Sequence, residues 1–261
     1  MVENIYDLGV ERIKLAFSGA ANSGKSHTAA LFIKEFGGKF IDFGKPTQVS
    51  NFTSAAKYYD ALKGHALTPC RHVGLNKDQY MFVNKWEDFQ TKIIDSAEMV
   101  RDTIKTVDNH VPWIVLDDSE GLRSLCTMWC SSENGHKMPN KNDYSMATSV
   151  TRLVLGTLEM YFNIIMICQV KDKYDTEGNN LGVTTPAFYP PNMEHIASAS
   201  IYMDYTEDEE LGTIQPRHAI RSVKDVWVCN AKLPKEIKYT DPLKISPKEM
   251  LEQLQFDKDQ W

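Results

Sequence analysis

The apolar positions along the chain fall into two kinds of segment, and these alternate. Short, nearly continuous apolar runs are typical of buried parallel strands, and they occupy residues 12–18, 39–43, 113–116 and 163–168. Between them lie segments whose apolar residues recur every three or four positions, which is the period of an amphipathic helix; these are residues 25–36, 85–107 and 144–160. This alternation predicts an α/β fold with a mostly parallel central sheet flanked by helices.

The last part of the chain has a different pattern. Residues 200–228 alternate around an acidic turn at 207–210, which predicts a β-hairpin or a small antiparallel extension. Ser246 followed by Glu249 has the spacing of a capping box and predicts a short terminal helix. Because no low-complexity linker divides the chain, we expect one domain over residues 1–261, with a core at 12–190 and an extension at 191–261.

Composition and charge narrow the function classes. The chain has 261 residues, 42% hydrophobic and 25% charged, as expected of a globular protein with a sizeable core. A net charge of −6 leaves no global basic field, so any nucleic-acid site must be a local patch. One candidate patch is 212–240, where six basic residues accompany two acidic ones, but a charged solvated surface is the favoured interpretation of this stretch.

Cysteine usage and hydropathy indicate the compartment. Five cysteines without a CxxC pair do not indicate a disulfide framework. Cys126, Cys130 and His136 are spaced as metal ligands could be, but buried thiols are the favoured interpretation. The first residues lack the apolar segment of a signal peptide, and polar residues interrupt the apolar stretch 153–170, which excludes a spanning helix. We therefore expect no membrane association and a cytoplasmic location in a bacterial, archaeal or virus-infected cell.

The most specific motif follows the first predicted strand. Residues 19–26, GAANSGKS, fit the phosphate-binding pattern G-x-x-x-x-G-K-[ST] completely, and a predicted helix follows. Lys25 is expected to bridge the β- and γ-phosphates of ATP, and the hydroxyl of Ser26 to bind Mg²⁺. The residues expected to contact the nucleotide are Gly19, Ala20, Ala21, Asn22, Ser23, Gly24, Lys25, Ser26 and His27.

A P-loop enzyme also needs a carboxylate to hold Mg²⁺, and the apolar run 113–116 is followed by two of them. Asp117 is the first choice for the metal, and Asp118 is its neighbour. Successive residues of a strand point to opposite sides, so the two cannot share one role. Asp118 also precedes a predicted helix and is a candidate N-cap.

The order of these elements resembles the core of RecA-like recombinases. The resemblance covers about residues 12–190 and is carried by LDDSEGL at 116–122, by the helix start at 142–144 and by IMICQVKDKY at 165–174. It is strongest to the core-only RecA-like ATPases encoded by phages and viruses, which act in single-strand annealing and recombination. The resemblance implies an ATPase, DNA-stimulated, that binds single-stranded DNA and forms a homo-oligomer, with a single-strand-binding or replication protein as a further partner.

The same resemblance assigns roles to individual residues. Gln169 matches the strand-end glutamine that senses the γ-phosphate and passes its state to a DNA-binding loop. Residues 131–142 and 170–187 take the positions of the two DNA loops, with candidate phosphate contacts at Lys137, Lys141, Lys171 and Lys173. Lys171 or Lys173 is also a candidate to reach the ATP of a neighbouring subunit.

The chain departs from this family where a glutamate is expected to activate water. Asp42 ends the strand after the phosphate-binding loop and is one candidate base; Glu120 is the other. Two other functions remain open at this point. One is a small-molecule or nucleotide kinase, although 171–187 contains no arginine for a lid. The other is a P-loop adaptor, such as a helicase loader, that works mainly through protein contacts.

Overall fold

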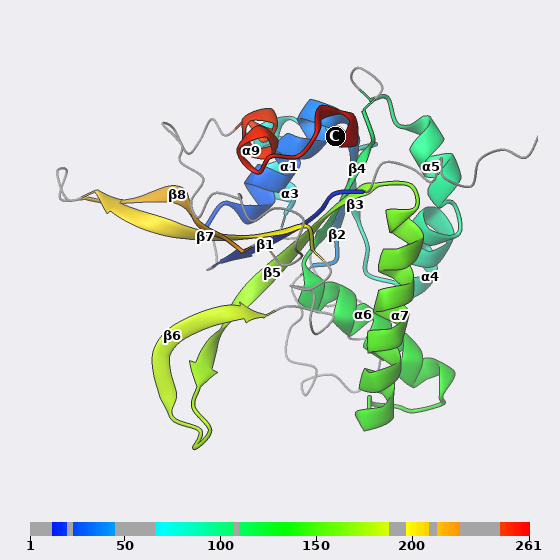
Figure 1. The fold of residues 1–261 in the computed structure, drawn as a ribbon. Helices are drawn as coiled ribbons and strands as arrows, with labels where there is room; N and C mark the ends of the chain where they lie inside the picture. The colour runs from blue at the N-terminus through cyan, green and yellow to red at the C-terminus, as the bar shows by residue number, and fades with distance from the viewer. Residues whose placement is uncertain are drawn as a thin grey trace, which may run out of the picture.

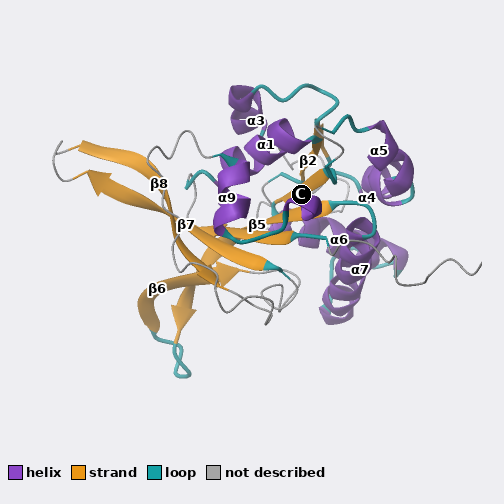
Figure 2. Ribbon diagram, turned by 45° about the horizontal axis from the view of Figure 1, so that its top comes forward, coloured by secondary structure: helices purple, strands orange, loops and turns teal. Residues whose placement is uncertain are grey.

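The computed structural model of the chain describes residues 12–19, 23–44, 66–106, 110–187, 197–208, 213–224 and 246–261. It is an α/β structure built on a mostly parallel sheet with helices on both faces (Figures 1 and 2). Six parallel strands run in the order β3-β2-β4-β5-β1-β7. They are β1 (Lys14–Gly19), β2 (Gly38–Asp42), β3 (Tyr80–Phe82), β4 (Trp113–Asp117), β5 (Asn163–Tyr174) and β7 (Ala199–Asp208).

Two more strands are antiparallel to this sheet. β6 (Asn180–Ala187) pairs with the second half of β5, and β8 (Thr213–Lys224) pairs with β7. Both hairpins extend beyond the helix-covered part of the sheet (Figures 1 and 2). The hairpin expected at 200–228 is therefore confirmed within the described residues, although β7 itself also belongs to the parallel sheet through its pairing with β1.

The helices divide between the two faces of the sheet. One face is covered by α1 (Lys25–Phe36), α3 (Leu67–Val73) and α9 (Pro247–Gln253). The other is covered by α4 (Trp86–Phe89), the π-helix η2 (Gln90–Ile94), α5 (Ala97–Thr103), α6 (Ser119–Glu133) and α7 (Lys141–Glu159). Alternate residues of a strand point to opposite faces, so Val115 packs with α1 while Ile114 and Leu116 pack with α6 and α7.

The junction of α1 and β2 requires glycine. Gly37 ends α1 with φ 84°, a left-handed value that residues with a Cβ rarely adopt. A Cβ on Gly38 would lie 2.0 Å from the carbonyl oxygen of Trp113 on β4. These two glycines therefore let β2 begin directly against β4, which places the ends of both strands in register, with Asp42 beside Asp117.

Two sequence-based predictions need correction. The single helix expected at 85–107 is three consecutive helices, because a π-turn at 90–94 takes up an extra residue and still buries Phe89, Ile93 and Ala97. The long loop expected at 170–187 is mostly a hairpin, because β5 continues to Tyr174 once β6 supplies its hydrogen-bonding partner. The apolar stretch 153–170 is the end of α7 and the start of β5, as predicted, and no helix among the described residues could cross a membrane.

Candidate nucleotide-binding site

The phosphate-binding motif joins the end of β1 to the start of α1. Gly24 precedes the helix with φ 89°, and Lys25 is its first residue. The Lys25 side chain is 5% exposed, and its ammonium donates hydrogen bonds to the Gly19 carbonyl oxygen at 2.8 Å and to Ser23 Oγ at 3.4 Å. The ammonium is thus held inside the loop, where the N-terminus of α1 adds its positive dipole end. Ala20, Ala21 and Asn22 lie outside the described residues.

Position 19 also requires glycine for a steric reason. Its φ is 150°, and a Cβ at this position would lie 2.0 Å from the carbonyl oxygen of Met203 on β7. The start of the loop therefore passes directly against the neighbouring strand, and a larger residue would displace it. The first glycine of the motif consequently serves the sheet as well as the loop.

Ser26 and Asp117 are hydrogen-bonded to each other at the carboxyl ends of the parallel strands. The Ser26 hydroxyl, on the first turn of α1, donates a 2.5 Å hydrogen bond to Asp117 Oδ2 at the end of β4. Asp117 is fully buried. Hydroxyl and carboxylate oxygens are ligands that Mg²⁺ accepts, usually together with water and substrate phosphates. The residues predicted to serve the metal therefore do lie together, and their chemistry fits Mg²⁺. The described residues hold no cluster of three or more His, Cys, Asp or Glu that would form a cage made by protein alone.

Asp118 has a different position from Asp117. One of its oxygens accepts the backbone N–H of Gly121 at 2.7 Å and caps the N-terminus of α6. Its other oxygen accepts a hydrogen bond from Nε2 of Gln169, at 2.9 Å. The N-cap role that the sequence offered for Asp118 is therefore present, and it comes with a contact to the strand-end glutamine that the sequence did not predict.

This contact orients the amide of Gln169. A carboxylate can only accept hydrogen bonds, so the amide NH₂ group must face Asp118 and the amide oxygen must face away from it. Gln169 is half-buried at the point where β5 leaves the parallel sheet and begins its pairing with β6. Gln169 therefore contacts the end of β4 through Asp118, and it contacts β6 through its own backbone.

Asp42, one of the two candidate bases, is committed to structural contacts. Its Oδ1 accepts the N–H of Gly44 at 2.8 Å, and its Oδ2 accepts the N–H of Ala66 and the phenol of Tyr80, both at 2.8 Å. Burial, followed by the negative charge of Asp42, raises the pKa of Tyr80, so this phenol stays a hydrogen-bond donor. These contacts favour a role for Asp42 in joining β2, α3 and β3.

Glu120, the other candidate base, lies in the first turn of α6. Its side chain is one-third exposed and lies 3.4 Å from Arg123, one turn further along the helix. An acid in the first turn is also favourable to the helix dipole. Glu120 is therefore the more accessible of the two candidate bases, although it is ion-paired with Arg123.

The candidate DNA-binding lysines lie on two projections. Lys137 and Lys141 are exposed at the turn between α6 and α7, and Lys171 is exposed on β5. The side chain of Lys173 is outside the described part of the structure. In Figures 1 and 2 the α6–α7 turn and the β5–β6 hairpin both extend from the lower side of the sheet. The hairpin also carries three acidic residues, Asp172, Asp175 and Glu177, so it is not basic overall.

The first predicted DNA loop is shorter and more ordered than the sequence suggested. α6 continues to Glu133, and only residues 134–140 connect it to α7. The buried carboxylate of Asp143 accepts hydrogen bonds from Asn134 Nδ2 at 2.7 Å, His136 Nδ1 at 2.9 Å and the N–H of Asn140 at 2.9 Å. Burial by itself would raise the pKa of Asp143, but the hydrogen bonds from Asn140, Asn134 and His136 outweigh it and lower this pKa.

The cysteines do not form a metal site with His136. Cys70, Cys126, Cys130 and Cys168 are buried thiols, and burial raises the pKa of Cys126 to about 12. His136 instead contacts Asp143. Cys229 lies outside the described residues, as does most of the basic stretch at 212–240.

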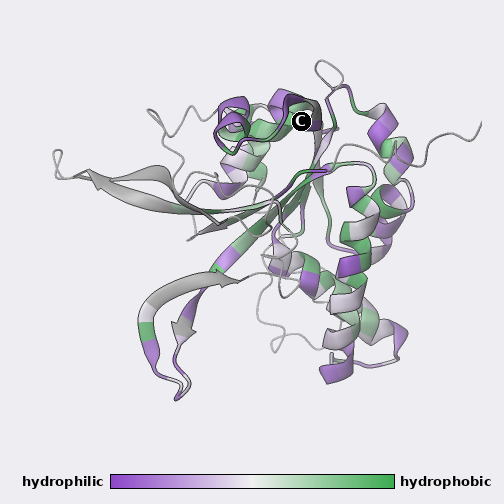
Figure 3. Ribbon diagram, in the orientation of Figure 1, coloured by the Kyte–Doolittle hydropathy of each residue, from purple (hydrophilic) through white to green (hydrophobic). Residues whose placement is uncertain are grey.

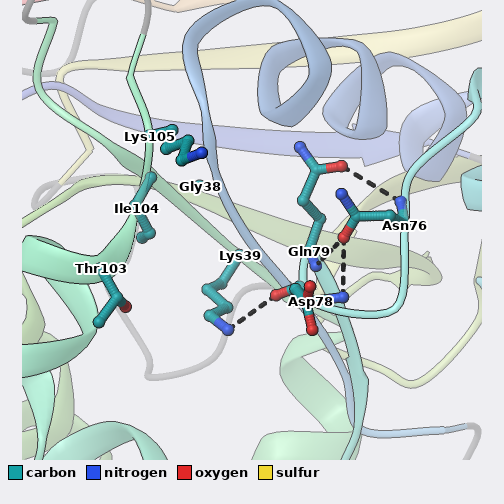
Figure 4. Close-up of a pocket in the computed structure, with 8 residues that line it drawn as sticks. All are labelled: Gly38, Lys39, Asn76, Asp78, Gln79, Thr103, Ile104 and Lys105. Atoms are coloured by element: carbon teal, nitrogen blue, oxygen red, sulfur yellow. Dashed lines mark hydrogen bonds between the residues drawn. The ribbon is translucent and has the colours of Figure 1, made fainter.

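A separate cleft of 510 Å³ lies at the opposite edge of the sheet (Figure 4). It is lined by the residues that begin β2 and precede β3 and β4, among them Gly38, Gln79 and Lys105. The Lys39 ammonium there donates to the Asp78 carbonyl oxygen at 2.7 Å. Since the strands are parallel, this cleft is at their amino ends, whereas Gly19, Asp42 and Asp117 are at their carboxyl ends. Ligands of open α/β sheets bind at the carboxyl ends.

The chain was compared with known proteins by sequence. It matches no protein-family model, and no curated protein is significantly similar to it.

Proposed function

We propose that this protein is a RecA-like P-loop ATPase. The observation that carries the proposal is the contact between Ser26 and Asp117, because it joins a complete phosphate-binding motif to a buried strand-end carboxylate 91 residues away. A chance match to the motif gives no reason for such a carboxylate to lie against its last hydroxyl. The parallel sheet and the position of the loop at its carboxyl edge are compatible with this fold.

The proposed reaction is in-line attack of water on the γ-phosphate. The new bond from the water oxygen to phosphorus forms as the bond to the bridging oxygen breaks, ADP leaves, and the proton of the water passes to a base. Phosphate oxygens would replace the Gly19 carbonyl as partners of the Lys25 ammonium, which then neutralises charge that develops in the transition state. Ser26 and Asp117 would hold Mg²⁺, which supplies further charge neutralisation between the phosphates. The amide oxygen of Gln169, which faces away from Asp118, would accept a hydrogen bond from the attacking water. Of the two candidate bases, Glu120 is the more accessible.

We propose single-stranded DNA as the ligand coupled to this site. Support comes from the continuity of β5, which carries Gln169 at the nucleotide edge and Lys171 two residues later on the projecting hairpin. The exposed lysines of the α6–α7 turn add a second positive site for phosphates. Recombination, annealing or replication are the processes this activity would serve.

One observation favours a second candidate, a P-loop adaptor. The β5–β6 hairpin has more acidic than basic residues, which suits a basic protein partner better than a DNA backbone. In that case ATP binding would be retained, and DNA would neither bind nor stimulate hydrolysis.

The test measures ATP hydrolysis with and without single-stranded DNA. We expect Mg²⁺-dependent hydrolysis that DNA stimulates, and its loss in Lys25→Ala and Asp117→Asn. Lys34→Ala is the matched control, because Lys34 lies on the same helix and donates only to the Val73 carbonyl oxygen in the described contacts. Full turnover in Lys25→Ala would refute the ATPase proposal. Hydrolysis without any DNA binding would select the adaptor instead.

A further inference from the structure

The outward face of α7 carries large exposed apolar side chains at intervals along its length, between small, polar or charged residues (Figure 3). Met146, Leu153 and Met160 are spaced by seven residues and are 43%, 71% and 61% exposed. Between Asp143 and Glu159 the only charged residue is Arg152. The solvent face of a helix in a globular protein normally carries many charged residues. This face has few charges, and it exposes large apolar side chains for which the described residues provide no packing partner.

Small residues alternate with the large ones on this face. Ser149 and Gly156 are exposed. Each lies three residues after one large apolar residue and four residues before the next. Gly156 is a poor helix former, and it lies in the last turn of a 19-residue helix, before the helix ends at Glu159. A Cβ on it would meet nothing within 4 Å, so the described part of the chain gives no steric reason for glycine there. A close approach by another backbone does give a reason.

We propose that α7 is a self-association surface, on which a second copy of this chain packs through its own α7 in the antiparallel direction. A two-fold axis between residues 154 and 155 places Leu153 against Gly156 of the second copy. The same axis places Met160 against Ser149 of the second copy. Leu153 and Met160 then each meet a small residue, and symmetry repeats both contacts.

Charge complementarity supports the antiparallel direction. Arg152 and Glu159 lie on the same flank of the exposed face, and the proposed axis brings Arg152 close to Glu159 of the second copy, twice. Glu159 already accepts a hydrogen bond from Lys14, but its side chain is 36% exposed and can accept another. In a parallel pair, large residues would meet large residues, and Arg152 would lose this partner.

The size of the contact sets the expected affinity. A helix of 19 residues is about 28 Å long, and an interface of one helix pair is at the small end of specific protein interfaces. We therefore expect a dimer that forms at micromolar concentration and dissociates on dilution. This association does not require nucleotide, so it is testable independently of the proposed ATPase function.

The first experiment is analytical ultracentrifugation of the full chain over a concentration series. The wild type should form dimers, and Leu153→Glu should be monomeric throughout. Gly156→Leu should also lose the dimer, although leucine is the better helix former and should keep or raise the melting temperature. Leu181→Glu is the matched control, because Leu181 lies on β6 and is 47% exposed. This variant should still dimerise. A monomeric wild type, or a dimer that survives in Leu153→Glu and Gly156→Leu, would overturn the proposal.

A second experiment tests whether the two α7 helices are antiparallel. It uses a short bis-maleimide cross-linker on one introduced cysteine at a time in a Cys229→Ser background, in which the four remaining native cysteines are buried. Leu153→Cys should yield cross-linked dimers. Met146→Cys should not, because the two copies of residue 146 would be about 25 Å apart along the antiparallel helices. Efficient cross-linking at both positions would indicate a parallel pair and contradict the proposed arrangement.

Discussion

At the scale of single residues, the two neighbouring aspartates at the end of β4 have separate roles. Asp117 faces the phosphate-binding loop and bonds Ser26, whereas Asp118 caps α6 and holds the amide of Gln169. The separation matters because only Asp117 is placed to serve a metal. In the proposed function Asp118 is a positioning residue, because it would act on the nucleotide through Gln169.

The Asp118→Asn variant separates the two roles of Asp118, capping α6 and orienting the amide of Gln169. Asparagine caps helices as well as aspartate does, so Asn at 118 can still accept the N–H of Gly121 and the melting temperature should change little. Its NH₂ group would, however, face the NH₂ of Gln169, and the Gln169 amide should rotate to present its oxygen to it. We expect kcat to fall about tenfold or more, with KM for ATP nearly unchanged. Steady-state kinetics and thermal unfolding check this.

Asp118→Ser is the companion variant for that prediction. Serine also caps helices but is too short to hold Gln169 in place, so it should lose kcat without unfolding. If either variant hydrolyses ATP at the wild-type rate, Asp118 does not orient a catalytic glutamine.

The pH dependence of stability tests Asp143. Its pKa in the folded protein is below the ordinary value of 3.8, so the ionised carboxylate stabilises the fold at pH values above about 4. This contribution is lost as the pH falls through the folded pKa. We expect the melting temperature of Asp143→Asn to lie below that of the wild type at pH 7, and the difference to shrink towards pH 3. A difference that is constant with pH would show that the charge of Asp143 is not what stabilises the α6–α7 turn.

At the scale of elements, α6 and α7 differ in how their glycines are used. In α6, a Cβ on Gly121 would lie 2.7 Å from the Gly44 carbonyl oxygen and 2.8 Å from Phe43 Cβ. The first turn of α6 therefore packs directly on the chain that follows β2. In α7, Gly156 has open space around it. The same substitution should consequently have opposite effects in the two helices.

Gly121→Ala should destabilise the protein by about 1–3 kcal/mol, because the methyl group forces the backbone of α6 away from β2. Gly156→Ala should stabilise the monomer by about 0.5–1 kcal/mol, because alanine favours the helix and meets no neighbour. Denaturant unfolding at a concentration low enough to keep the chain monomeric measures both. Equal effects of the two substitutions would contradict the close packing of α6 on Gly44.

At the scale of the whole molecule, β5 connects the nucleotide edge to the surface proposed for DNA. If Gln169 senses the γ-phosphate, ATP and DNA must affect each other's binding equally, since coupling between sites is reciprocal. Such coupling is typically about 1–3 kcal/mol. The phosphate-contacting lysines should contribute affinity but little to the coupling.

Gln169→Ala should leave the affinity for ATP nearly unchanged and reduce the coupling between ATP and DNA. Lys171→Ala with Lys173→Ala should instead weaken DNA binding and flatten its salt dependence, because fewer counterions are released. Fluorescence anisotropy with single-stranded DNA, with and without a non-hydrolysable ATP analogue at two salt concentrations, separates the two effects. Equal DNA affinity with and without nucleotide in the wild type would exclude the coupling.

Features that depend on local patterns were predicted from the sequence. The phosphate-binding loop, the strand ending in Asp117 and the helix 25–36 follow from residues near one another in the chain, because periodicity, glycines and caps act locally. The α/β class follows from the alternation of such segments. The short elements α3 and β3 were missed, because seven and three residues are too few to show a period.

The tertiary structure alone decided which distant residues meet. The hydrogen bond between Asp118 and Gln169 joins residues 51 positions apart. The carboxylate of Asp42 accepts hydrogen bonds from Ala66 and Tyr80, which lie later in the chain. The extension of β5 depended on β6, because a strand persists only where another strand pairs with its backbone groups. The exposed face of α7 likewise became visible only when packing showed which of its apolar residues the core leaves uncovered.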